Sequence, residues 1–291
     1  MAYGDAAEDD RRLARIANGV GLALAFVGLT MLLAWLLQPL AMPRMVARAE
    51  AAVTDPAEPV ASAAPANAAG KPRMAVLMIE LGADAALGQA AIEKLPSPIG
   101  LAFVPDGGAS RMLARRATVD GHESWIGIPM QPKAWPQVRP GSNTLLVDDP
   151  AQTNARRLGW ALDRIDRPVG AYPMMGSAFT ESMPAMQPVA AMLRAENLAF
   201  LDTRSSPRSV AAQSVADAGG RAMSNDIFLD LDPDPAAVRR SLAQLSDKAR
   251  RNGQAVGLIQ ATPRNIALLG DWAYGLGEDG PRLVPPSELT R

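Results

Sequence analysis

Short apolar runs recur along the chain after residue 72. Each run is four to seven residues long and lacks the apolar–polar alternation of a strand with one solvated face. Such near-continuous runs are typical of strands buried on both faces, as in a parallel sheet. We expect strands at residues 74–79, 99–104, 124–130, 169–172, 198–202, 226–230 and 255–260.

Helical patterns separate these runs. Residues 150–165 and 235–252 are two examples, and each begins near an aspartate that can accept hydrogen bonds from the first helical turn. The predicted ends are Asp149 as N-cap with Pro150 in the first turn, and Asp234 as N-cap with Gly253 as the stop. Alternating strands and helices predict an α/β fold with a mostly parallel sheet, either open or closed into a barrel.

An uncharged apolar stretch precedes this region. Residues 20–37 contain no charge over 18 positions, and at about 1.5 Å per residue they nearly span a hydrocarbon core of about 30 Å. A buried core helix and a cleaved signal peptide are the alternatives. The stretch is apolar on all faces and longer than a usual signal-peptide core, so we expect a transmembrane helix at 16–41.

Flanking residues indicate how this helix is oriented. The arginines before the span are Arg11, Arg12 and Arg15, and those after it are Arg44 and Arg48. This weak bias favours a cytoplasmic segment at 1–15. Residues 42–72 are rich in Ala and Pro and are expected to form a linker. The sequence therefore predicts a single-pass protein of the bacterial inner membrane, with a globular domain at 73–291 in the periplasm.

Composition narrows the possible chemistry. Lys and Arg number 29 against 30 Asp and Glu, so there is no broad positive charge to attract nucleic acid. The chain has no cysteine and a single histidine, His122. Catalytic zinc sites usually contain two or three imidazoles, or imidazoles with a carboxylate. An ordinary zinc site is therefore not expected.

The carboxyl ends of the predicted strands are where a site is expected, because ligands of parallel α/β folds bind there. These positions are Glu80, 127–130, 173–175, 202–204, Asp230 and 260–262. An irregular, proline-containing insertion at 131–149 follows one of the strands. It is interpreted either as one wall of a cleft or as a surface loop.

Several motifs occur in a fixed order along the domain. They are ELG at 80–82, LPSPIGLAFVP at 95–105, GHE at 121–123, IPMQP at 128–132, MGSAFT at 175–180, FLDTRSSPRSVA at 200–211 and DIFLDLDPDP at 226–235. Over residues 72–289 this order resembles the divergent polysaccharide deacetylase family, which is related to the NodB-type carbohydrate esterases. The resemblance implies a distorted (β/α) barrel.

The same resemblance implies a set of metal-binding and acid–base residues, and this chain departs from that set. The expected Asp-Asp pair corresponds to Ile79 and Glu80. The expected histidines correspond to Gly127, Met174 and Gln260. Gly, Met and Gln cannot replace imidazoles around a zinc ion that would activate water. The resemblance therefore implies a member without zinc or another cofactor, and without the family's catalytic set.

The remaining polar residues give candidates for ligand binding and for a rearranged catalytic site. Candidate ligand-binding residues are Glu80, Asp202, Arg204, Asp230 and Gln260, and candidate catalytic residues are Glu80, Asp202 and His122. His122 lies between a predicted helix and strand, where a structural hydrogen-bonding role is expected. Asp202 and Arg204 are expected to form either a structural ion pair or a bidentate clamp on a ligand. Glu80 is expected to be a lone carboxylate at the mouth of the cleft.

Three functions follow as hypotheses. The first is a membrane-anchored envelope protein that binds a cell-wall glycan or an envelope protein in a non-catalytic cleft. The second is an active carbohydrate N-acetyl hydrolase with a rearranged site. The third is a structural subunit of an envelope complex. Nucleic acid is not an expected partner.

Overall fold

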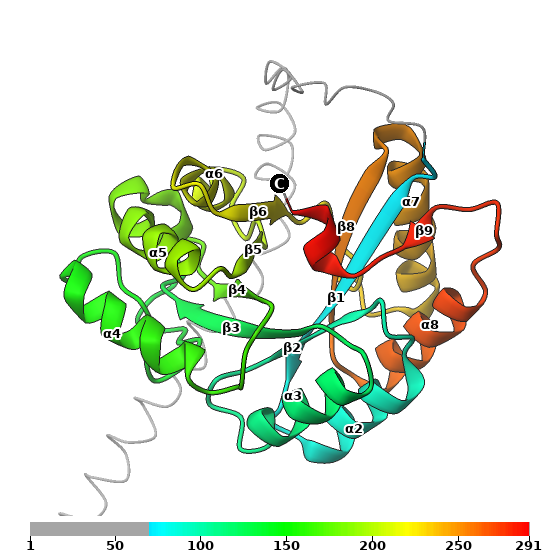
Figure 1. Cartoon of the computed structure of the whole chain (residues 1–291), viewed down its shortest axis with the longest axis horizontal. Helices are drawn as coiled ribbons and strands as arrows, with labels where there is room; N and C mark the ends of the chain where they lie inside the picture. Colours follow the sequence, from blue (N-terminus) through cyan, green and yellow to red (C-terminus); the bar gives the residue numbers. More distant parts are fainter. Residues whose placement is uncertain (1–69, 291) are drawn as a thin grey trace, which may run out of the picture. The chain divides into compact units, whose positions relative to one another are not determined.

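A curled layer of parallel strands with helices on its outer side forms the folded part of the chain (Figure 1). The computed structural model describes residues 70–290. The strands are β1 (Arg73–Leu81), β2 (Gly100–Phe103), β3 (Ser124–Met130), β4 (Gly170–Met175), β5 (Ala199–Asp202), β6 (Arg221–Ser224), β7 (Ile227–Phe228), β8 (Gln254–Gln260) and β9 (Arg282–Leu283). The helices are α2 (Ala85–Lys94), α3 (Ser110–Val119), α4 (Ala151–Leu162), α5 (Met183–Ala195), α6 (Ala211–Asp217), α7 (Pro235–Asn252) and α8 (Pro263–Tyr274), with the 3-10 turns η1 (Phe179–Glu181) and η2 (Pro286–Leu289).

The strand order shows how the layer curls. Neighbouring strands follow the order β6-β5-β4-β3-β2-β1-β8-β7, and all of these pairs are parallel. The two end strands, β6 and β7, are separated by only Asn225 and Asp226. The Asn225 amide donates to the Asp202 carbonyl, and the Asp226 amide donates to the Val256 carbonyl. One bent segment thus bridges β5 and β8, and the curled α/β layer is consistent with the distorted barrel that the family resemblance implies.

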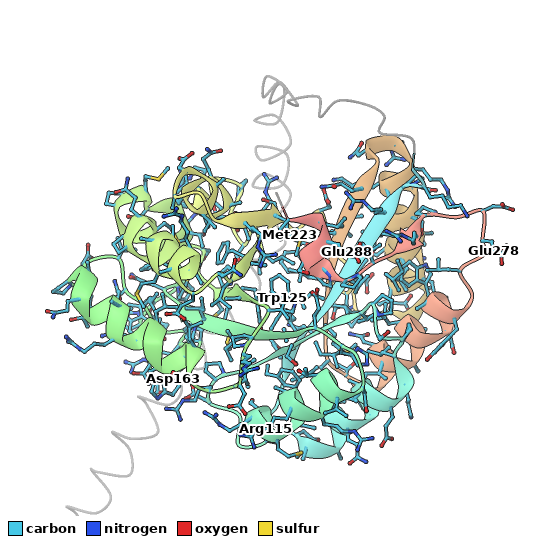
Figure 2. All side chains as sticks on the ribbon, in the orientation of Figure 1. Arg115, Trp125, Asp163, Met223, Glu278 and Glu288 are labelled. Carbon is cyan, nitrogen blue, oxygen red and sulfur yellow. The ribbon has the colours of Figure 1, made fainter. Side chains whose placement is uncertain are left out.

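Side chains fill both faces of this layer. The outer cluster lies between strands and helices and includes Met78, Phe103 and Phe200. The inner cluster includes Trp125 and Tyr172, which are at most 1% exposed. Figure 2 shows Trp125 in the middle of the ring of strands. Because both faces are buried, the strands need apolar residues at successive positions, which explains the runs in the sequence.

The C-terminal segment contributes to the inner cluster at the amino ends of the strands. β9 pairs with the start of β1. Leu289 of η2 is 1% exposed and belongs to the inner cluster. The Glu123 carboxylate accepts hydrogen bonds from the Ser287 amide and hydroxyl and from the Trp125 indole. This anchored segment leaves the carboxyl ends of the strands as the edge available for a site.

Helix ends confirm one predicted cap and correct another. Asp234 caps α7 by accepting from the Ala236 and Ala237 amides, and Gly253 follows with φ 80°, a conformation that glycine adopts without strain. Asp149 does not cap α4. That helix begins one residue later than predicted, with Pro150 at the cap position. The Asp149 carboxylate instead pairs with Arg157 at 2.7 Å.

Within residues 70–290, no helix combines the length and the apolar character needed to cross a membrane. The predicted span at 16–41 and most of the predicted linker at 42–72 lie outside the described residues. Both stay predictions.

Candidate functional site

Two carboxylates lie at the carboxyl ends of β1, β7 and β8, one on each side of β8. Ile79 pairs with Gln260 across β1 and β8, so Glu80 lies directly beyond this pair. The backbone amide of Gln260 donates to the Asp230 carboxylate at 3.0 Å. Glu80 and Asp230 therefore lie on the two sides of Gln260, and we call them the carboxylate pair. Glu80 is not the lone carboxylate that the sequence predicts.

Asn265 holds Asp230 in position. Its side-chain amide donates to the Asp230 carboxylate at 2.8 Å and to the Gln260 carbonyl at 2.9 Å. Asn265 is itself fixed at the start of α8, where its backbone amide donates to the Thr262 hydroxyl. This buried residue was not among the predicted site residues. Its only sequence signal is a position just after the Thr262 cap, which indicates a helix start and not a site.

The surroundings of the carboxylate pair favour its protonated forms. Glu80 is exposed as a residue, yet the protein around its carboxyl group reduces hydration and raises its pKa above 4.5. The negative charge of Asp230 raises the Glu80 pKa further. Burial also raises the pKa of Asp230, against the opposing effect of its hydrogen bonds from Gln260 and Asn265. The negative charge of Asp230 therefore disfavours ionisation of Glu80.

Gly127, Tyr172 and Met174 form the floor beneath the carboxylate pair. Gly127 of β3 pairs with Tyr172 of β4. A β-carbon added to Gly127 would lie 2.5 Å from the Met174 sulfur and 3.1 Å from the Tyr172 hydroxyl. Both distances are shorter than ordinary van der Waals contacts. The space that a side chain at position 127 would enter is thus already filled by Met174 and Tyr172.

The Tyr172 hydroxyl has an unusual environment. The residue is 1% exposed, and its hydroxyl makes no hydrogen bond to any residue in the part of the chain that the structure describes. Burial raises the pKa of this phenol, the nearby charge of Glu80 raises it further, and the Glu80 backbone amide beside the hydroxyl opposes both effects. Most buried hydroxyls have a partner, so an orphaned one at a candidate site needs an explanation.

Strand ends at this edge adopt a rare backbone conformation. Glu80, Met175 and Arg204 have φ values of 68°, 61° and 52°, and they follow or end β1, β4 and β5. Side chains other than glycine rarely occupy this left-handed region, and such residues often cluster at functional sites. The strained positions thus lie on the same edge as the carboxylate pair.

The residues present do not fit the zinc ion that the family resemblance implies. Among residues 70–290, no three His, Asp or Glu side chains are placed to share a metal ion. The positions of two expected imidazoles are occupied by the Gly127 backbone and the Met174 thioether. The remaining donors are two carboxylates, an amide and a phenol, which is not a zinc-binding set.

Two other predicted catalytic residues point away from the carboxylate pair. His122 is 4% exposed, and its ring nitrogens lie 2.8 Å from the Ile99 carbonyl and 3.3 Å from the Ile92 carbonyl. This is the structural role that the sequence predicts. Asp202 is 2% exposed and follows Leu201 of the inner cluster, so strand alternation places it on the outer face.

Of the two interpretations of Asp202 and Arg204, the structural ion pair is wrong, and the bidentate ligand clamp stays a prediction. The Asp202 carboxylate accepts from the Arg204 backbone amide at 2.9 Å and from the Ser209 hydroxyl at 2.7 Å. It makes no contact of ion-pair length with the Arg204 guanidinium, which is exposed. A short aspartate side chain bonds readily to the backbone two residues on, and that local turn replaces the expected salt bridge.

A polar network ties together the loops that follow β3, β4 and β5. Glu181 pairs with Lys133 at 2.6 Å and with Arg208 at 2.8 Å, and it also accepts from the Ser206 hydroxyl. Hydrogen bonds from Lys133, Ser206 and Arg208 lower the Glu181 pKa to about 2. Lys133 belongs to the insertion at 131–149, which the network therefore anchors at the edge that carries the site. The sequence did not indicate this network, because its members come from three separate loops.

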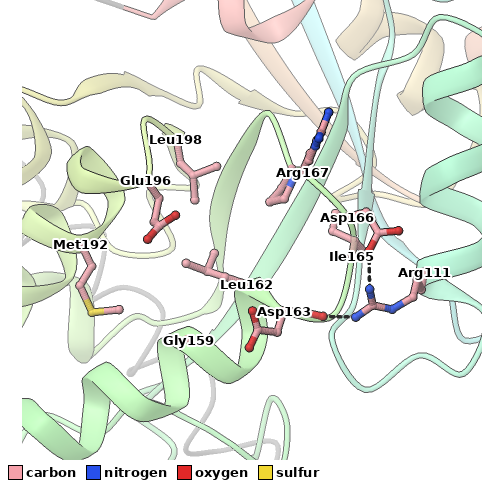
Figure 3. Close-up of a pocket in the computed structure, with 11 residues that line it drawn as sticks. Arg111, Gly159, Leu162, Asp163, Ile165, Asp166, Arg167, Met192, Glu196 and Leu198 are labelled. Carbon is pink, nitrogen blue, oxygen red and sulfur yellow. Dashed lines mark hydrogen bonds and ion pairs between the residues drawn. The ribbon is translucent and has the colours of Figure 1, made fainter.

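Two pockets of the described residues do not coincide with the carboxylate pair. One of about 940 Å³ is lined by residues between α4, α5 and the amino ends of β4 and β5, where Arg111 bonds to Asp166 and to the Asp163 carbonyl (Figure 3). A second, of about 580 Å³, lies between Arg204 and α7. The first pocket lies at the opposite edge of the sheet, at the amino ends of the strands. Residues at that edge of a barrel usually stabilise the fold, and ligands bind at the other edge.

Comparisons with known proteins agree with the fold. A family model described as divergent polysaccharide deacetylase matches residues 76–290. The chain is 29% identical over 185 residues to the uncharacterized protein YibQ of Escherichia coli, covering 64% of this chain and 57% of that protein. It is 30% identical over 190 residues to an uncharacterized protein of Haemophilus influenzae, covering 65% and 67%. The chain thus spans less than two thirds of the E. coli protein.

Two solved structures have a similar fold. The crystal structure of an uncharacterized protein from Agrobacterium tumefaciens is similar with a TM-score of 0.73 and 32% identity, covering 78% of this chain and 92% of that one. A structure from Enterococcus faecalis has a TM-score of 0.55 at 12% identity, covering 76% of this chain and 100% of that one. The second likeness extends to the fold alone.

Proposed function

This chain belongs to the divergent polysaccharide deacetylase family, and we propose that its barrel binds an envelope glycan without hydrolysing it. The observation that carries the proposal is the filled floor of the site. Met174 and Tyr172 occupy the space next to Gly127, where the family resemblance implies a metal-binding imidazole. A family site without its Lewis acid loses the means to polarise an acetyl carbonyl and activate water.

The groups that remain are suited to hydrogen bonding with a sugar. Glu80 and Asp230 supply carboxylate acceptors, and Gln260 lies at the exposed end of β8 with an amide that both donates and accepts. Met175, 45% exposed, adds an apolar surface at the end of β4. A few polar groups beside an apolar surface are typical of small-molecule sites.

We also propose that the domain is held at the outer face of the bacterial inner membrane. The predicted span at 16–41 and the predicted linker at 42–72 support this placement. A linker of this composition can extend by about 3.1 Å per residue, which would let the barrel reach a polymer of the envelope.

A second candidate function is a hydrolase with a rearranged acid–base pair. The observation in its favour is the raised pKa of both Glu80 and Asp230, since acid–base catalysts often have carboxyl groups tuned in this direction. Binding is the preferred function because Met174 and Tyr172 fill the space next to Gly127, where the family's metal-binding imidazole is expected.

The test is calorimetric titration of the purified full-length protein with N-acetylglucosamine oligosaccharides, intact or de-N-acetylated, alongside an acetate-release assay. We expect saturable binding of at least one oligosaccharide with no acetate released. Release of acetate that stops in the Glu80→Gln variant would favour the second candidate. Failure of every oligosaccharide to bind would contradict both.

A further inference from the structure

The carboxylate pair has no cationic partner in the part of the chain that the structure describes. None of the ion pairs among residues 70–290 includes Glu80 or Asp230. The charged group that acts on Glu80 is Asp230, which has the same sign. Like charges held together without a counter-charge destabilise each other. A cation brought by a ligand would relieve this repulsion.

The geometry holds the pair in this unfavourable arrangement. The Asp230 carboxylate accepts hydrogen bonds from the Gln260 backbone amide and the Asn265 side-chain amide, so it cannot turn away without losing both. Glu80 is placed by a left-handed backbone at a bulge in β1, where the pairing with β2 shifts register. Backbone strain at such a position persists only when the surrounding structure maintains it.

The Tyr172 hydroxyl is a second and independent indication of a ligand. It lies close to Glu80, whose backbone amide is beside it, but no group among residues 70–290 completes a hydrogen bond of normal geometry with it. A hydrogen-bonding group brought by a ligand, or a water that the ligand fixes, would supply that partner. The unsatisfied hydroxyl thus lies beside Glu80, one member of the carboxylate pair.

We infer that the sugar bound at this site carries a free ammonium group, as de-N-acetylated amino sugars do, and that Glu80 and Asp230 bind that group. This inference rests on the proposed glycan-binding function and names its ligand class. An ammonium group has three donors and no acceptor, which matches two carboxylates with a neighbouring hydroxyl oxygen. Two carboxylates alone offer too few oxygens for a calcium ion, which takes six to eight ligands.

The experiment compares two tetrasaccharides that differ only in their acetyl groups. One is the tetramer of glucosamine and the other is the tetramer of N-acetylglucosamine, each titrated into the full-length protein at low ionic strength. A hydrogen bond to a charged group contributes enough that we expect the glucosamine tetramer to bind about tenfold more tightly or better. Added salt should reduce this preference, because exposed charges are screened.

Three variants assign the preference to the carboxylate pair. Glu80→Gln and Asp230→Asn keep side-chain shape and remove one charge each, so each should abolish the preference. Asp232→Asn is the matched control, because Asp232 is an exposed aspartate whose carboxylate accepts only from the Asp234 amide. It removes the same charge two residues away and should leave the preference intact. Circular dichroism of each variant establishes that it is folded.

The results distinguish failure of ammonium recognition from failure of glycan binding. Equal binding of the two tetramers, tighter binding of the acetylated one, or a preference that survives in both pair variants overturns the ammonium inference and leaves glycan binding standing. Absence of binding to both tetramers overturns the two together.

Discussion

Replacing Gly127 with alanine tests whether the floor of the site is filled as described. The new β-carbon would lie 2.5 Å from the sulfur and 2.7 Å from Cγ of Met174, so that side chain must move. Overpacking a core typically destabilises by about 1–3 kcal/mol. A methionine has three rotatable bonds and adapts more easily than a rigid side chain, which places the expected loss near the lower end, at about 1 kcal/mol.

The same substitution should have a different effect once Met174 is shortened. In the Met174→Ala background the two closest atoms are absent and the Tyr172 hydroxyl, at 3.1 Å, remains, so only a small shift is needed. Alanine also makes the unfolded chain less flexible than glycine does. Gly127→Ala should then be neutral or stabilise by up to about 1 kcal/mol. The two substitutions, Gly127→Ala and Met174→Ala, should therefore show a coupling free energy of about 1–2 kcal/mol in a double-mutant cycle.

Urea unfolding followed by circular dichroism measures all four members of this cycle in the full-length protein. Gly108→Ala is the control, because no atom lies within 4 Å of a β-carbon added there. Its free energy of unfolding should stay within about 0.5 kcal/mol of the parent. Additive effects of Gly127→Ala and Met174→Ala would refute the claim that Met174 occupies this space.

Three further substitutions test neighbouring parts of the structure. Tyr172→Phe removes a buried hydroxyl without a partner, so the free energy of unfolding should be unchanged or higher, and a loss above about 1 kcal/mol would reveal a missed hydrogen bond. His122→Ala removes the ring that lies against two buried carbonyls, to one of which a neutral imidazole donates, and should lower the free energy of unfolding by about 2 kcal/mol, whereas glycan affinity of the folded protein should not change. Because the pKa of Glu181 is lowered in the folded protein, its ionised carboxylate stabilises the fold at pH values above its ordinary pKa of 4.5. This contribution is lost as the pH falls toward about 2. Glu181→Gln should therefore flatten the dependence of thermal unfolding on pH between those values, and an unchanged acid profile would contradict the assignment.

The strands of this fold follow from the sequence because their environment leaves a simple signal. β1, β3 and β8 are covered on both faces, so apolar residues occupy nearly every position and the runs match the strands closely. β6 was missed because its residues, RAMS, are largely polar and it is covered less completely. Its pairing depends on β5, which no local pattern reveals.

The candidate site was only partly predictable for a similar reason. Strand-end positions gave Glu80, Asp230 and Gln260 correctly as residues of one edge, because parallel strands end together. The Asp202–Arg204 pair failed because a local turn competes with a salt bridge. The role of Tyr172 depends on packing across the barrel, where β4 faces strands far along the chain, and such contacts have no period in the sequence.

Zinc binding tests the central claim most directly. Crystals of the protein soaked in excess zinc can be measured at the zinc absorption edge, where a bound ion gives an anomalous peak. We predict no peak at the floor formed by Gly127, Tyr172 and Met174. A fully occupied peak there, coordinated by Glu80 at about 2.0–2.2 Å, would contradict the account.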